Sequence, residues 1–160
     1  MDLFEKRLES YLTLYKIPLG PNQLDPTVFY FSETGDLPRL LPSIITQISR
    51  DIEFIVDGQP SRVENYYLVG PALKPGNKNR SGELKVLVII NKKIMDVDVD
   101  GLSAEQLLRV AKRVSGKLAT GTTRPINYTI SVRDIEKDNY EGIYNLFTNE
   151  WVKIPNGLNK

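Results

Sequence analysis

A cluster of basic residues in the middle of the chain could bind phosphate. Between residues 71 and 93, six basic side chains accompany a single acidic one, Glu83. The six are Lys74, Lys78, Arg80, Lys85, Lys92 and Lys93. Gly70, Gly76 and Gly82 flank and interrupt the loop PALKPGNKNRSG, where glycine lets backbone amides approach an anion closely. The spacing fits neither GxxxxGK[ST] nor GxGxxG, so an ordinary solvated loop remains an alternative.

A second group, Asp96, Asp98 and Asp100, could hold a divalent cation. In a strand, alternate residues share a face, so these carboxylates would project together while Val97 and Val99 project the other way. The segment that begins at Asp96 also resembles a calcium-binding loop, with Gly101 at the sixth position. However, Leu107 occupies the position where such a loop has its bidentate glutamate. The alternative is a half-buried strand with its acids in solvent.

The amino-acid composition excludes several kinds of chemistry. The 160 residues include no cysteine and no histidine, which excludes disulfides, thiolate metal sites, cysteine nucleophiles and imidazole acid–base catalysis. The net charge of +1 provides no global field for non-specific nucleic-acid binding. Any catalysis must therefore use carboxylates, lysine, hydroxyls or a metal on oxygen ligands.

The elements that would position these residues alternate between helix and strand. Hydrophobic spacing predicts helices over 2–15, 43–55 and 103–118, with Leu107, Val110, Ala111, Val114 and Leu118 as the apolar stripe of the last. Strands are expected at 28–31, 64–73, 83–91 and 125–135, with a return strand near 95–100 and a closing helix within 138–147. This order favours an α/β (α+β) fold, a small mixed sheet packed with helices.

We expect one domain over 1–160. Its core would span 40–135, with the N-terminal helix 2–15 and a C-terminal helix or tail at 138–160 packing on it. No run of about 18 apolar residues is present, so we expect no membrane partner and a cytoplasmic location.

The runs LVGPAL, NRSGELKVLVI and INYTISV, in that order, resemble the minimal nucleotidyltransferase core of the DNA polymerase beta superfamily. In that family a strand ends in Gly-Ser or Gly-Gly, the next strand carries two carboxylates one residue apart, and a later strand supplies a third. The resemblance covers about residues 40–135. It implies a mixed sheet flanked by helices, two divalent metal ions and nucleotidyl transfer from a nucleoside triphosphate.

The match is partial when it is carried over residue by residue. Gly70 stands for the family glycine, but Pro71 replaces the serine or glycine that follows it. Ser81 lies two residues before Glu83, which stands for the first metal carboxylate and the catalytic acid. Lys85 occupies the second carboxylate position, where an ammonium repels a metal ion and instead attracts phosphate. The strand INYTISV offers Asn127, Thr129 and Ser131 on one face, with no carboxylate before Asp134.

These departures predict a phosphate- or nucleotide-binding protein whose nucleotidyltransferase-like core has lost catalysis. Its ligand-binding residues would be Gly70, Lys74, Lys78, Arg80, Ser81 and Lys85, and RNA is a further candidate ligand. One alternative is an active enzyme in which Glu83, Asp96 and Asp98 hold Mg²⁺ or Mn²⁺. Another is an adaptor that pairs acidic and basic surfaces with a second copy or a protein partner, since residues 1–60 hold nine acidic and five basic side chains.

Overall fold

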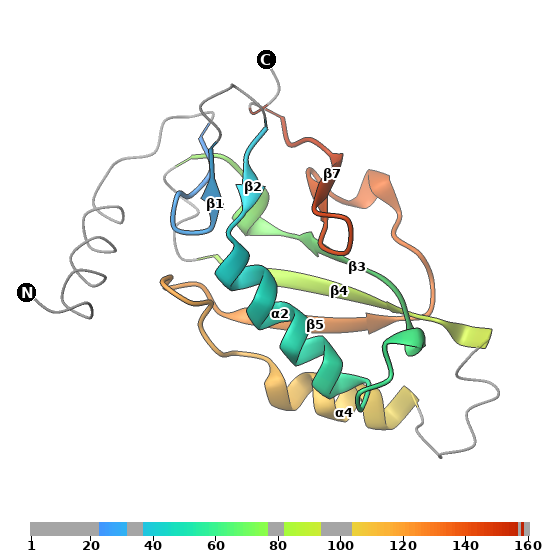
Figure 1. Ribbon diagram of the computed structural model, residues 1–160. Coiled ribbons are helices and arrows are strands. Elements are labelled where there is room, and N and C mark those ends of the chain that lie inside the picture. Colours follow the sequence, from blue (N-terminus) through green and yellow to red (C-terminus); the bar gives the residue numbers. More distant parts are fainter. Residues whose placement is uncertain (1–22, 32–36, 77–81, 94–103, 157, 159–160) are drawn as a thin grey trace, which may run out of the picture.

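A mixed five-stranded sheet forms the centre of the protein (Figure 1). The computed structural model describes residues 23–31, 37–76, 82–93, 104–156 and 158. The strands are β3 (Val63–Val69), β4 (Leu84–Ile90), β5 (Ile126–Ser131), β6 (Ile143–Asn145) and β7 (Glu150–Lys153), in the order β5-β4-β3-β6-β7. β4 and β5 are parallel, and the other neighbours are antiparallel. The expected mixed sheet packed with helices is confirmed.

Two helices, α2 (Pro42–Ile55) and α4 (Ala104–Val114), cover one face of this sheet (Figure 1). The buried residues of α2 are Ile44, Ile48, Ile52 and Ile55, which follow the expected helical spacing. In α4 the expected stripe is buried at Leu107, Ala111 and Val114. Leu118 was expected to continue the stripe but is 56% exposed, because α4 ends at Val114 and Gly116 follows with φ 95°.

The interior strand β4 is buried on both faces, as its apolar sequence predicts. Leu84, Val86, Val88 and Ile90 face the helices. Leu87 and Ile89 pack on the opposite face with Tyr67, Val69 and Ile143. By this alternation, Lys85 lies on the face of the sheet away from the helices.

The helix expected within 138–147 is wrong. After the short 3₁₀ turn η4 (Lys137–Asn139), the chain forms the antiparallel pair β6–β7. Tyr144 and Trp151 are paired across the two strands, and their rings meet at 5.0 Å and 85°. Within 138–147, Tyr140, Tyr144 and Phe147 fall at helical spacing, so the aromatic pattern alone did not distinguish a helix from a hairpin.

A small second sheet, β1 (Phe29–Tyr30) with β2 (Arg39–Leu40), packs beside this hairpin. The Phe29 ring stacks on Trp151 at 5.8 Å, and the Trp151 indole N–H donates to the Pro38 carbonyl at 2.8 Å. The predicted helix at 2–15 and return strand at 95–100 lie outside the described residues. Within the described part of the chain, no helix is long and apolar enough to cross a membrane.

Candidate functional site

The turn that follows β3 brings Gly70 against Lys85. β3 ends at Val69, which pairs directly with Lys85 on β4. Gly70 then adopts φ 91° and ψ −161°, a conformation essentially restricted to glycine. A Cβ at Gly70 would lie 3.2 Å from the Lys85 Cβ. Two of the residues predicted to bind phosphate therefore meet at one end of the sheet.

The two ends of the loop at residues 71–82, called the basic loop from here on, lie close together. It begins with the 3₁₀ turn η2 (Pro71–Leu73), and a Cβ at Gly82 would lie 2.8 Å from the Pro71 Cβ. Further along, the Gly76 N–H donates to the Gln23 carbonyl at 3.0 Å. Lys74 is exposed on this loop. Lys78, Arg80 and Ser81 lie outside the described residues, as do Asp96 and Asp98.

Glu83 and Asn127 form the other side of this end of the sheet. Asn127 pairs with Lys85 across the parallel strands β4 and β5, and its side-chain amide donates to Glu83 Oε2. Glu83 thus accepts a hydrogen bond from an amide where the resemblance implies a third carboxylate. Within the described residues, no three carboxylates gather in a way that could hold a metal ion.

Asp134, the first acidic residue after β5, forms hydrogen bonds away from Glu83 and Lys85. Its Oδ1 accepts hydrogen bonds from the Tyr67 hydroxyl at 3.1 Å and from the Ile135 N–H at 2.8 Å. Burial raises the pKa of Tyr67, and the hydrogen bond to Asp134 raises it further. The Asp134 carboxylate therefore forms hydrogen bonds that link β3 to the segment following β5.

A buried ion pair supports the site and was missing from the sequence interpretation. Arg124 Nε donates to Asp25 Oδ2 at 3.0 Å, and its Nη1 donates to the Gly82 carbonyl at 2.8 Å. The other Asp25 oxygen accepts from the backbone N–H and hydroxyl of Thr27. Arg124 belongs to the loop before β5, and its contact with Gly82 holds that loop beside residues 71–82. Its charge, however, is paired with Asp25 in the interior.

The local sequence Asp-Pro-Thr could have indicated that Asp25 organises a turn, because aspartate commonly accepts from the backbone two residues on. No local pattern indicates that its partner is Arg124, which follows 99 residues later.

Comparison with known proteins identifies no relative: the chain matches no protein-family model, no curated protein and no solved structure.

Proposed function

We propose that this protein binds the phosphate groups of a nucleotide at the Gly70 turn and Lys85, without catalysing nucleotidyl transfer. The observation that carries the proposal is the close approach of Gly70 and Lys85, whose Cβ would lie 3.2 Å from a Cβ at Gly70. Glycine at this position lets the chain turn directly beside Lys85, and the Lys85 ammonium supplies the positive charge that attracts a phosphate.

The charges around this turn support an anion as ligand. Lys85 is half-buried, so its electrostatic attraction is less screened than that of a fully exposed lysine. Lys74 adds a second, exposed positive charge on the loop that starts at the turn. The nearby carboxylate of Glu83 accepts the Asn127 amide, which satisfies part of its hydrogen-bonding capacity. Arg124 contributes by holding Gly82 in place, since its own charge is paired with Asp25.

The same residues argue against metal-dependent transfer. Two-metal catalysis needs several carboxylates to hold the ions against the reacting phosphates. Among the described residues at this end of the sheet, Lys85 and Asn127, which pair across β4 and β5, occupy the positions where further carboxylates would be needed beside Glu83. A lysine can replace the positive charge of a metal toward a bound phosphate, but it cannot activate the attacking group as a metal does.

Isothermal titration at low salt, with EDTA to remove divalent ions, tests this function. ATP and inorganic tripolyphosphate should bind, and adenosine should not, because the phosphates are recognised. Lys85→Met should weaken ATP binding at least about tenfold, the loss of one charged hydrogen bond. Lys112→Met is the matched control, because Lys112 is an exposed lysine on α4, and it should leave ATP affinity unchanged.

Three results would contradict the proposal: no heat with either phosphate compound, equal affinity of the wild type and Lys85→Met, or binding of a short RNA with no binding of ATP. A separate incubation with labelled nucleoside triphosphates and Mg²⁺ or Mn²⁺ tests the enzymatic alternative. Transfer that disappears in Glu83→Ala would favour an active nucleotidyltransferase, whereas our proposal expects no transfer.

A further inference from the structure

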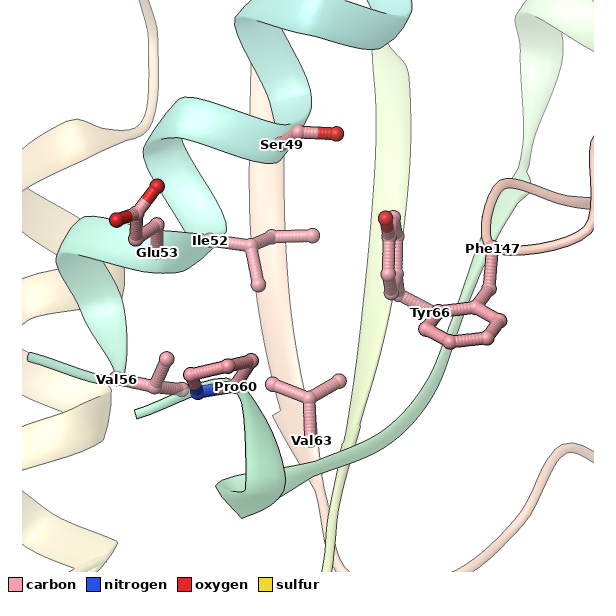
Figure 2. A pocket seen from close by; sticks show the side chains of 8 residues that line it. All are labelled: Ser49, Ile52, Glu53, Val56, Pro60, Val63, Tyr66 and Phe147. Carbon is pink, nitrogen blue, oxygen red and sulfur yellow. The ribbon is translucent and has the colours of Figure 1, made fainter. Parts of the chain in front are cut away.

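A cavity of about 310 Å³ lies between α2 and β3, on the helix-covered side of the sheet (Figure 2). Its apolar wall comes from Ile52 of α2, from Val56 directly after this helix, from Pro60, and from Val63 of β3. Tyr66 belongs to the same apolar cluster as the helices, whereas Lys85 lies on the opposite face of the sheet. The cavity is therefore separate from the proposed phosphate site.

Polar contacts hold the walls of this cavity in position. The connection after α2 is fixed by Arg62, which is 4% exposed and whose Nη1 donates to the Val56 carbonyl at 2.8 Å. The turn between β6 and β7 is fixed by Asn145, whose Oδ1 accepts the backbone N–H groups of Phe147 and Thr148 at 2.9 and 3.0 Å. The Leu146 N–H donates to the Tyr66 carbonyl at 3.1 Å. These contacts make the cavity preformed, which is typical of small-molecule sites.

An unusually exposed aromatic side chain stands at this cavity. Phe147 is 66% exposed, the highest value among the large apolar side chains of the described residues. Its ring meets the Tyr66 ring edge to face, at 5.9 Å and 89°. Figure 2 shows the two rings side by side on the wall opposite Ile52. Such a pair offers a third aromatic ring a favourable contact geometry.

Two hydroxyl groups give the cavity a polar end. Figure 2 shows the Ser49 and Tyr66 hydroxyls directed to the same end of the cavity. Within the described part of the chain, neither hydroxyl makes a hydrogen bond, and both residues are half-buried. A hydroxyl can donate and accept, so this end suits a ligand with one small polar group. Glu53, also at the cavity, is exposed and would repel an anion.

We propose that this cavity binds a small neutral molecule with one or two fused aromatic rings and a single hydroxyl or ring N–H group. The volume is near the lower end of the range of about 300–1,000 Å³ for ligand sites, which favours a compact ring system. The aliphatic wall and the Tyr66–Phe147 pair contact the rings. Ser49 and Tyr66 bind the polar group.

Fluorescence titration with 2-naphthol tests the proposal, with naphthalene and 2-naphthoate as comparison probes. 2-Naphthol should bind saturably, about fivefold more tightly than naphthalene because of its hydrogen bond. 2-Naphthoate should bind at least about tenfold more weakly than 2-naphthol, because its charge meets Glu53 and an apolar wall. Tyr66→Phe should lower 2-naphthol affinity toward that of naphthalene.

Phe147→Ala should weaken 2-naphthol binding about fivefold through loss of one ring contact. Phe54→Ala is the matched control, because Phe54 is 59% exposed on α2 and does not line this cavity, so 2-naphthol affinity should stay unchanged. ATP affinity should be unaltered in both variants, which separates this site from the proposed phosphate site. Should Phe147→Ala fail to fold, amide NMR of the wild type with 2-naphthol must show its largest shifts at Ile52, Val63 and Tyr66. Absence of saturable binding, equal affinity for naphthalene and 2-naphthol, or equal effects of the two alanine variants would overturn the proposal.

Discussion

Arg124 Nε lies 3.0 Å from Asp25 Oδ2, and the two side chains are 1% and 2% exposed. This ion pair joins the turn before β1 to the loop before β5 across 99 residues of sequence. Because Arg124 also donates to the Gly82 carbonyl, the pair holds one end of the basic loop beside Pro71. The geometry of the candidate phosphate site therefore depends on a contact that is itself inaccessible to the ligand.

Removing one partner of this pair should destabilise the protein strongly. Arg124→Met leaves the Asp25 carboxylate buried without its counter-charge, and the expected loss is about 3–5 kcal/mol in the free energy of unfolding. Urea denaturation followed by circular dichroism measures it. The control is Arg109→Met, which breaks the exposed 3.4 Å pair with Glu105 and should cost less than about 0.5 kcal/mol. Equal losses in the two variants would show that Arg124 and Asp25 do not form a buried pair.

Gly70→Ala should destabilise the protein and disturb the phosphate site. The φ of 91° strains any side chain, and the added Cβ would press on Lys85 at 3.2 Å, so we expect a loss of about 1–3 kcal/mol. Gly76→Ala is the control, since Gly76 has φ 112° with nothing within 4 Å of an added Cβ. It carries backbone strain alone and should cost about 1 kcal/mol. Denaturation midpoints compare the two, and an unchanged midpoint in Gly70→Ala would contradict the turn geometry.

Two tyrosines should make the protein less stable at alkaline pH. Burial raises the pKa of Tyr128, and so does its hydrogen bond to Asp51 Oδ2 at 2.5 Å; burial also raises the pKa of Tyr144. Above the ordinary value of 10.0, the unfolded chain loses these protons while the folded chain retains them. The contribution of these tyrosines to stability is therefore constant below about pH 9 and falls above pH 10, by up to about 1.4 kcal/mol per pH unit for each group.

Urea denaturation at pH 9 and pH 11 measures this dependence, and absorbance at 295 nm reports tyrosine ionisation. In Tyr128→Phe, the loss of stability between the two pH values should be smaller than in the wild type. An equal loss in Tyr128→Phe would show that Tyr128 ionises alike in the folded and unfolded states.

The sequence predicts the central sheet and helices well because they depend on local patterns. The isoleucines of α2 follow the helical period, and the run from Leu84 to Ile90 has the apolar character of a strand buried on both faces. The closing hairpin was missed because the aromatic residues within 138–147 are spaced as a helix would space them. The cross-strand contact of Tyr144 with Trp151 depends on packing against Phe29, which lies more than 100 residues earlier in the chain.

For the candidate site too, some features follow from local sequence and others depend on the tertiary structure. The meeting of Gly70 and Lys85 follows from pairing two successive strands, which sequence order makes easy to anticipate. The pairing of Asp25 with Arg124 depends on the three-dimensional path of both loops, and no residue spacing encodes it. The cavity beside Tyr66 likewise requires Phe147 to be brought back by a turn whose geometry Asn145 determines.

Amide NMR of the wild-type protein titrated with ATP tests the central claim most directly, because it locates the binding site residue by residue. The account predicts that the largest shifts fall on Gly70, Lys74, Gly82 and Lys85, and that the amides of α4 around Lys112 stay unperturbed. Shifts concentrated on α4, or no shifts at millimolar ATP, would contradict a phosphate site at the Gly70 turn.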